Sequence, residues 1–247
     1  MPFDLGLGQT AALSIALFGA AFVRGYSGFG FSAIFIAFAA LITNPLPLIP
    51  VVFACEMLMT VFQARGIRGH VDWRRVFALL AGAAIVLPAS VWFILSLGEG
   101  AVRLAGSFIV LVMSLILLAG WSLPAIRTSG HVGVGAVSGL CNSAGIGGLP
   151  VAAFMAAQPM EAARFRATMI VYLTGLDLIT MPLLWAGGLV TWETALGVTL
   201  AFPLLGLGVW LGGRKFLAAS PSTFRRFAVM LLLTLSLLGL LRAIIRI

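Results

Sequence analysis

The chain has 247 residues, of which 62% are hydrophobic and only 9% are charged, and its formal net charge is +8. A soluble domain carries about a quarter of charged residues, so this composition excludes an ordinary soluble protein. The basic residues lie mostly in short loops, which is typical of membrane orientation signals and not of a nucleic-acid-binding face. We therefore predict an all-α polytopic membrane protein with no nucleic-acid partner, embedded in a lipid bilayer.

The first apolar region, 8–42, contains two short stretches, 11–23 and 28–42, which are joined by a few Gly, Tyr and Ser residues. A helix of about 13 residues rises only about 20 Å, whereas the hydrocarbon core is ~30 Å thick. We therefore predict a re-entrant or short-helix hairpin that enters and leaves on the same side. A full span over 5–23 stays open, because that segment suffices if its helix begins early.

Six further stretches approach the ~20 apolar residues that a spanning helix needs. Three follow the first hairpin, and three follow a second hairpin predicted at 132–157, whose arms are joined by Asn, Ser and Gly. The predicted spans are 46–65, 76–97, 104–123, 167–186, 195–213 and 227–246.

The orientation follows from the basic loops 65–75 and 213–226, each of which holds four Lys or Arg residues. If both loops are cytoplasmic, as the positive-inside bias indicates, the N-terminus is periplasmic. The first hairpin then enters from outside and the second from inside. The halves 1–124 and 125–247 are thus predicted to be inverted-topology repeats within one membrane domain, each with a hairpin and three transmembrane helices.

The two halves also resemble each other in sequence. The stretch "GFGFSAIFIAFAALITNPLP" (28–47) corresponds to "GIGGLPVAAFMAAQPME" (145–161): each begins with G-x-G, continues apolar, and reaches a polar residue followed by Pro. The next span in each half carries one acid, Glu56 or Asp177. This common order favours an ancient duplication. Inverted repeats with Gly-interrupted short segments are typical of secondary transporters.

Arg24 lies in the apolar stretch "VRGYSGFGF", directly before the first glycine tip. A guanidinium can grip carboxylate or sulfonate oxygens with two parallel hydrogen bonds. Helix starts at Gly28 and Gly145 would add backbone donors and positive dipole ends, and we expect the two tips to meet at one anion cavity. The predicted substrate-binding residues are Arg24, Tyr26, Ser27, Gly28, Gly30, Asn142, Ser143, Gly145 and Gly147.

Each of these assignments has a structural alternative. Arg24 could snorkel to the interface if 5–23 spans the membrane. The tip hydroxyl and amide groups could only satisfy loop backbone, and the glycines could only allow close helix packing. On the binding hypothesis, Arg24→Ala abolishes sulfonate binding while the protein still folds.

Glu56 and Asp177 are the acids within predicted spans. Either could carry a coupling proton, because burial favours the neutral form of a carboxyl group. Either could instead be a static ion partner, and Arg24 is the obvious mate for Glu56. A proton or a sodium ion is therefore the candidate coupling ion, and the oligomeric state is open.

The chain resembles the TauE/SafE family of sulfite exporters, also called the toluene sulfonate uptake permease family. The resemblance rests on "RGYSGFGFSAIFIAFAALITNPLPLIPV" and "GLCNSAGIGGLPVAAFMAAQPMEAARFRATMIVYL", and the length and duplicated layout match over the whole chain. It implies a multi-pass carrier in the bacterial inner membrane for sulfur-containing anions such as sulfite, toluenesulfonate, sulfoacetate or hypotaurine. Many relatives are richer in glycine at the first tip, so Phe29 and Phe31 leave the preferred anion open.

We therefore predict a secondary transporter of sulfur-containing anions that works by alternating access, with no enzymatic activity, cofactor or metal. An anion channel with the same site is the first alternative. An intramembrane thiol–disulfide carrier using Cys55 and Cys141 is disfavoured, because neither has a C-x-x-C partner. An aspartyl protease using Glu56 and Asp177 is disfavoured as well, because no supporting motif flanks either acid.

Overall fold

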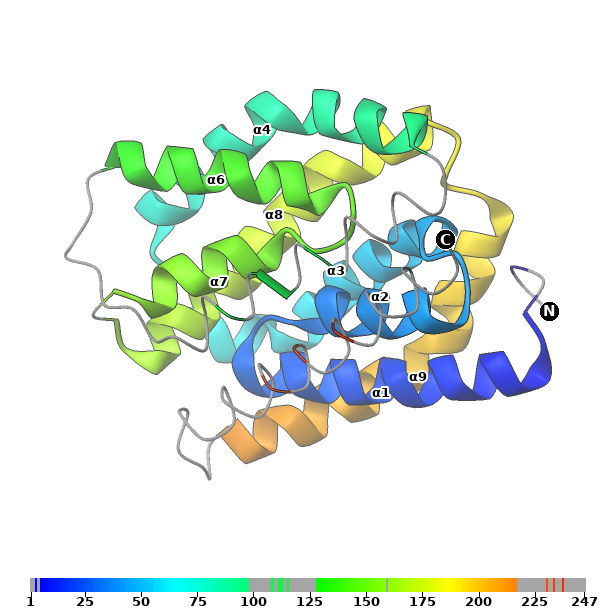
Figure 1. Cartoon of the computed structure of the whole chain (residues 1–247). Helices are drawn as coiled ribbons and strands as arrows, with labels where there is room; N and C mark the ends of the chain where they lie inside the picture. The colour runs from blue at the N-terminus through cyan, green and yellow to red at the C-terminus, as the bar shows by residue number, and fades with distance from the viewer. Residues whose placement is uncertain are drawn as a thin grey trace.

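A computed structural model of the chain consists of helices in the part that it describes (Figure 1). The described residues are 3, 5–97, 108, 111–112, 115, 128–158, 160–216, 230, 233 and 237. The predicted spans 104–123 and 227–246 therefore lie almost wholly outside the described residues.

The helices of the two halves follow one another in the same order of long and short elements. The first half contains α1 (Leu7–Ser27), α2 (Phe31–Ile42), the short η2 (Leu46–Leu48), α3 (Ile49–Ile67) and α4 (Trp73–Ser96). The second half contains α6 (Thr128–Asn142), α7 (Gly148–Ala156), α8 (Ala162–Ala186) and α9 (Trp192–Phe216).

Five helical segments in the described part are long and apolar enough to cross a membrane. Three of them contain the spans predicted at 46–65, 167–186 and 195–213, and a fourth, Trp73–Ser96, covers all but the last residue of the span predicted at 76–97. The fifth is α1, whose 21 residues suffice for a span. The multi-pass membrane class is thereby confirmed for the described helices.

The expectation of a short first arm over 11–23 is wrong, because α1 continues without interruption from Leu7 to Ser27. The polar residues near its end do not break the helix, since they find partners inside the protein. Ser27 donates its hydroxyl hydrogen bond to the carbonyl oxygen of Val23 at 2.9 Å, one helical turn earlier. The first hairpin thus joins a full-length helix to the 12-residue α2.

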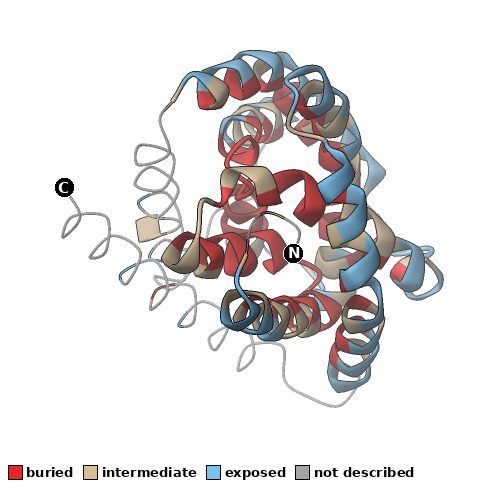
Figure 2. Ribbon diagram, turned by 90° about the vertical axis from the view of Figure 1, so that its right-hand side faces the viewer, coloured by how far each residue is buried: buried red, intermediate tan, exposed pale blue. Residues whose placement is uncertain are grey.

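The two short helices α2 and α7 lie inside the molecule. All eight residues of α7 from Gly148 to Met155 are buried, and α2 is buried along most of its length. Figure 2 shows buried residues at the centre and exposed residues on the outer faces of the surrounding helices. Backbone that cannot span is tolerated at membrane depth only when protein covers it, and this arrangement meets that condition.

The outer faces are apolar, as expected for contact with lipid. Large exposed side chains include Ile15, Ile85 and Trp92, which are 75%, 75% and 73% exposed. Trp185 and Trp192 lie on either side of the turn between α8 and α9 and are also largely exposed. Tryptophan favours the membrane–water interface, so this turn is expected at the headgroup level.

Glycines bring the long helices into close contact. A Cβ atom on Gly25 of α1 would lie 2.5 Å from the carbonyl oxygen of Val209 in α9. A Cβ atom on Gly82 of α4 would overlap the carbonyl oxygen of Val132 in α6. Small residues allow such close backbone approach between membrane helices.

The contacts between helices form matching sets in the two halves. α1 packs along α9, and α4 packs along α6. In the same way, α3 contacts α9, and α8 contacts α4. The short helices α2 and α7 each contact the helix before and the helix after them. α3 and α8 cross each other at the centre. α1 and α6 run in opposite directions in Figure 1. If α1, α2, α3 and α4 are exchanged with α6, α7, α8 and α9 in that order, each of these contacts becomes another contact of the set, and the contact of α3 with α8 becomes itself.

Candidate functional site

The centre of the site is a buried ion pair between α1 and α3. Arg24 lies in the last turn of α1, and its Nη1 donates to Oε1 of Glu56 at 3.1 Å. The two side chains are 0% and 1% exposed. The pairing of Arg24 with Glu56 that the sequence suggested is thus present, and Arg24 does not reach the surface.

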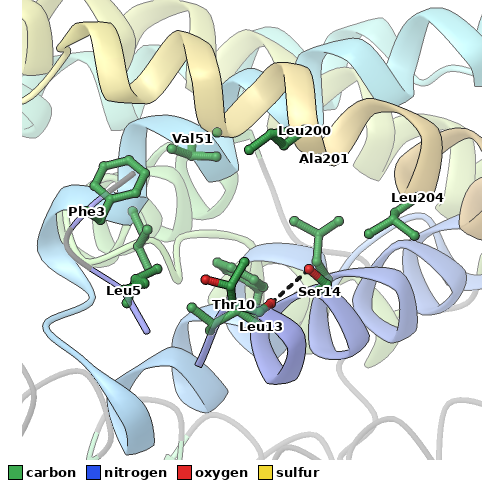
Figure 3. Close-up of a pocket in the computed structure, with 13 residues that line it drawn as sticks. Phe3, Leu5, Thr10, Leu13, Ser14, Val51, Leu200, Ala201 and Leu204 are labelled. Atoms are coloured by element: carbon green, nitrogen blue, oxygen red, sulfur yellow. Dashed lines mark hydrogen bonds between the residues drawn. The ribbon is translucent and has the colours of Figure 1, made fainter. Parts of the chain in front are cut away.

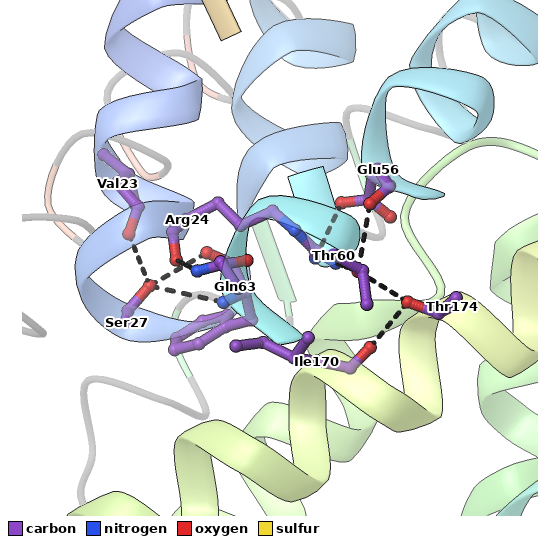
Figure 4. A network of polar contacts seen from close by, with 9 residues as sticks. Val23, Arg24, Ser27, Glu56, Thr60, Gln63, Ile170 and Thr174 are labelled. Atoms are coloured by element: carbon purple, nitrogen blue, oxygen red, sulfur yellow. Dashed lines mark hydrogen bonds and ion pairs between the residues drawn. The ribbon is translucent and has the colours of Figure 1, made fainter. Parts of the chain in front are cut away.

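Further polar contacts connect Arg24 to α8 (Figure 4). Its Nη2 donates to the hydroxyl oxygen of Thr60 at 3.3 Å, and the hydroxyls of Thr60 and Thr174 share a hydrogen bond of 2.7 Å. Gln63 Nε2 donates to the carbonyl oxygen of Arg24 at 3.5 Å. Helices of both halves therefore meet in one polar network around the guanidinium.

Asp177 of α8 is fully buried beside this network. Its carboxyl group lies within hydrogen-bonding reach of Glu56, and its charge interacts with that of Arg24. Neither Asp177 oxygen has a hydrogen-bond donor among the described residues. The structure thus gathers both predicted acids and the predicted arginine, from three helices, into one cluster.

The first tip, residues 28–30, follows directly on α1. Gly28 and Gly30 have φ values of 81° and 91°, in the left-handed region that favours glycine. A Cβ atom on Gly28 would lie 2.9 Å from the carbonyl oxygen of Arg166. The hydroxyl oxygen of Ser27 lies 2.9 Å from the carbonyl oxygens of Val23 and Phe29, so its one hydrogen can be donated to either of them and can serve the backbone of the turn.

A second arginine, Arg166 of α8, reaches the same tip. Its Nη2 donates to the carbonyl oxygen of Gly25 at 2.7 Å, and its charge interacts with that of Arg24. From the sequence alone, Arg166 is one more basic residue close to the second predicted hairpin. Its partner lies 141 residues away, so no local pattern could have identified this contact.

The second tip, residues 143–147, carries only uncharged donors. Asn142 Nδ2 donates to the hydroxyl of Thr180 at 2.9 Å, and Ser90 donates its hydroxyl hydrogen bond to Ser143 at 2.7 Å. Gly145 has a φ of 77° and packs against the side chain of Ile36 in α2.

Each tip packs on a helix start in the other half, and a meeting of the two tips at one anion cavity stays a prediction. At the first tip, the rings of Phe29 and Phe165 meet edge to face with centroids 5.8 Å apart. At the second tip, Gly145 lies against Ile36 and against Ile49 at the start of α3. The predicted residues therefore form two groups joined through α3 and α8.

The starts of α2 and α7 lie two to three residues beyond the predicted positions at Gly28 and Gly145. Gly30 and Gly147 are the N-cap residues, and neither helix start has a side-chain cap. Both are buried, as are Tyr26, Asn142 and Ser143. Buried helix starts without a side-chain cap leave backbone N–H groups for other acceptors.

The cysteines and one pocket are further features of the described part. Cys55 and Cys141 are free and buried. A pocket of about 100 Å³ opens between the N-terminal half of α1 and α9 (Figure 3). Its polar side chains, Thr10 and Ser14, both donate to backbone carbonyl oxygens of their own helix, so the pocket presents a mainly apolar wall.

Comparison with known proteins adds one finding to this geometry. The family model described as sulfite exporter TauE/SafE matches residues 13–238. No curated protein and no solved structure matches the chain. The matched segment contains both tips, both acids and both arginines of the site.

Proposed function

The chain belongs to the sulfite exporter TauE/SafE family, and from this premise we propose that it is a secondary transporter of sulfur-containing anions in the bacterial inner membrane. The family and the five apolar helices make it a multi-pass membrane protein. The proposed substrates are sulfite and organic sulfonates or sulfinates, such as toluenesulfonate, sulfoacetate and hypotaurine.

The observation that carries the proposal is the buried guanidinium of Arg24. It is 0% exposed, and its Nε has no hydrogen-bond partner in the described part of the chain. A buried cation inside a membrane protein is costly and is typical of a substrate path. Its donors suit sulfonate oxygens, which it would hold together with Tyr26, Ser27 and the amides near Gly30.

Alternating access is supported by the way the two halves correspond. Thr60 follows Asn44 at the same sequence distance as Thr174 follows Gln158, and these two threonines meet where α3 crosses α8. We take this crossing as the axis of two inverted repeats, 1–124 and 125–247. One repeat would rock against the other and expose the site to each side in turn.

A periplasmic N-terminus belongs to the same proposal. The turn after α3 carries Arg65 and Arg68 and leads into Arg74 and Arg75, so it should be cytoplasmic. His70 in that turn is exposed. A thiol reagent that cannot cross the membrane should label a His70→Cys variant in inverted vesicles but not in intact cells; the opposite result would reverse the orientation.

The test of the binding site must preserve charge balance. Arg24→Ala alone would leave Glu56 as an unpaired buried charge, which costs about 3–5 kcal/mol. Lost binding in that variant would not be separable from lost folding. We therefore pair the neutral double variant Arg24→Gln/Glu56→Gln with the single variant Glu56→Gln, which keeps the cation.

The measurement is the thermal stabilisation of purified protein by sulfite, toluenesulfonate, sulfoacetate and hypotaurine. Glu56→Gln should gain more stability from its anion than the wild-type protein, because the anion replaces the missing carboxylate. The double variant should fold and gain nothing. A double variant that is stabilised as strongly as the wild type would remove Arg24 from the site.

Transport in proteoliposomes then separates a carrier from a channel. A carrier driven by a second gradient accumulates its anion against the anion's own gradient. A channel only equilibrates the anion.

A further inference from the structure

Asp177 presents a problem that the ion pair does not solve. The side chain is fully buried, and neither of its oxygens has a donor among the described residues. An ionised carboxylate without donors costs several kcal/mol or more in such surroundings. The group must therefore be neutral or be held by a cation.

The charged and titratable groups around Asp177 come from few elements. α3 brings Glu56 and α1 brings Arg24, and both interact with Asp177. Tyr172 lies on α8 itself, interacts with Asp177 and with Cys141 of α6, and donates to the hydroxyl of Ser138.

The remaining described helices that pack on α8 bring no further charge near Asp177. α7 has no titratable residue, and α4 has none after Arg75 at its start. On α3 itself, Cys55 is the other titratable neighbour, and it interacts with Glu56. The cluster therefore contains one permanent cation and two carboxyl groups.

The contacts distinguish the two carboxyl groups. Glu56 accepts a hydrogen bond from the guanidinium of Arg24 at 3.1 Å, so this carboxyl group already has a cationic partner. Asp177 has no such donor. A proton on Asp177 would supply the missing donor, because its O–H can then donate to Glu56, within whose reach it lies. With that proton, the cluster of Arg24, Glu56 and Asp177 is neutral.

We propose that Asp177 is the proton-binding site of the transport cycle, so that one proton crosses with each anion. This rests on the proposed transport function. The proton forms an O–H bond with Asp177 from the side to which the site is open, and that bond breaks when the site opens to the other side. No group is oxidised or reduced, and Glu56 stays the resident partner of Arg24.

Charge explains why the two ligands bind together. When Asp177 is protonated, the cluster is neutral and an anion can approach Arg24. When Asp177 is ionised, these three groups carry one net negative charge, which weakens the attraction of the anion to Arg24 and to the nearby Arg166. Because coupling between two ligands is reciprocal, the bound anion favours proton binding to the same extent.

A sodium ion is the rival occupant, and the oxygen inventory argues against it. Hard cations bind through several oxygen ligands. The hydroxyl oxygen of Thr60 already accepts a hydrogen bond from Arg24 and shares another with the hydroxyl of Thr174. Glu56 is engaged by Arg24. A proton needs only the single acceptor that Glu56 offers.

The first test needs no substrate. Infrared difference spectra between acidic and alkaline pH, recorded on ligand-free protein in lipid, should show a buried protonated carboxyl in the wild type and lack it in Asp177→Asn. Glu193→Gln, which removes an exposed carboxyl, is the matched control and should keep the band. An unchanged band in Asp177→Asn, or no such band in the wild type, would overturn the proposal.

The second test uses toluenesulfonate, whose sulfonate stays ionised over the working pH range. Wild-type affinity should fall up to tenfold per pH unit as the pH rises through the titration, and uptake should acidify a dye-loaded vesicle. Asp177→Asn should bind with little pH dependence, exchange the anion, and move no protons.

The outcomes separate the two proposals. Sodium-dependent stabilisation that disappears in Asp177→Asn would identify a sodium site and overturn the proton site. Failure of every sulfur anion to bind the wild type would contradict the proposed function, while the infrared result would still decide whether Asp177 binds a proton.

Discussion

The two hairpin tips have similar backbones and different chemistry. Gly28 and Gly145 both adopt positive φ angles, and each packs on the other half of the chain. Arg166 donates to the carbonyl oxygen of Gly25 just before the first tip and Arg24 lies in the last turn of α1, whereas the second tip is held by uncharged groups such as Asn142. In the described part of the chain, positively charged side chains therefore accompany the first tip and not the second.

The acids show the same asymmetry. Gln63 follows Asn44 at the same sequence distance as Asp177 follows Gln158, so Gln63 is the position in α3 that corresponds to Asp177. By the same count, Ile170 in α8 corresponds to Glu56. Both acids nevertheless lie in one cluster. A carrier that works by alternating access needs a single site that both halves enclose, and unequal side chains in a repeated frame provide one.

Replacing the positive-φ glycine of each tip by alanine should give the largest difference in stability between variants of the two tips. Gly28→Ala adds left-handed strain of about 1–2 kcal/mol and places a Cβ atom 2.9 Å from the backbone carbonyl oxygen of Arg166. Gly145→Ala adds similar strain, but its Cβ atom meets the flexible side chain of Ile36 at 2.9 Å. Thermal unfolding should therefore show a greater loss of stability for Gly28→Ala than for Gly145→Ala. Gly28→Ala should also lose the stabilisation by the anion.

Gly66→Ala is the control for this pair, because nothing lies within 4 Å of the added Cβ atom and its φ is not positive. Equal losses in Gly28→Ala and Gly145→Ala would show that contact with Arg166 does not distinguish the tips.

A smaller effect is expected from Ser90→Ala, which tests the uncharged tip. The hydroxyl oxygen of Ser90 lies 2.7 Å from that of Ser143 and 2.8 Å from the carbonyl oxygen of Leu140, and its one hydrogen can be donated to either of them. Loss of these contacts should cost about 1 kcal/mol of stability, the usual net value of a hydrogen bond. Sulfonate affinity, measured by calorimetry, should change less than twofold, because no charge is removed. A tenfold loss of affinity would place the second tip in direct contact with the anion.

The sequence predicted the spans well because length and hydropathy along one segment determine them. α8 and α9 contain their predicted ranges, and α3 and α4 match theirs to within three residues at either end. The end of α1 was predicted incorrectly, because Arg24 looked like a break in an apolar helix when read without Glu56, 32 residues later. The pairing itself was suggested by counting the few buried charges. Packing of each tip on the opposite half depends on tertiary contacts that no single segment encodes.

The smallest expected change in stability comes from Arg166→Gln, which most directly tests the charge difference between the tips. The variant loses the hydrogen bond to Gly25, but it also removes repulsion between Arg166 and Arg24, so the two effects on folding oppose each other. Anion affinity has no such compensation, since one of two nearby positive charges is lost. We expect an affinity loss of up to about tenfold, or ~1.4 kcal/mol.

Salt dependence identifies the origin of that loss. Arg166→Lys keeps the charge and should retain most of the affinity, which makes it the matched control. If Arg166 acts through its charge, added inert salt should weaken wild-type binding more than binding by Arg166→Gln, because ions screen the longer-range attraction. If Arg166→Lys loses as much affinity as Arg166→Gln, the contact with Gly25 matters and the charge does not. The tips would then differ in how their backbones are held, and Arg24 would supply the positive charge that attracts the anion near the first tip.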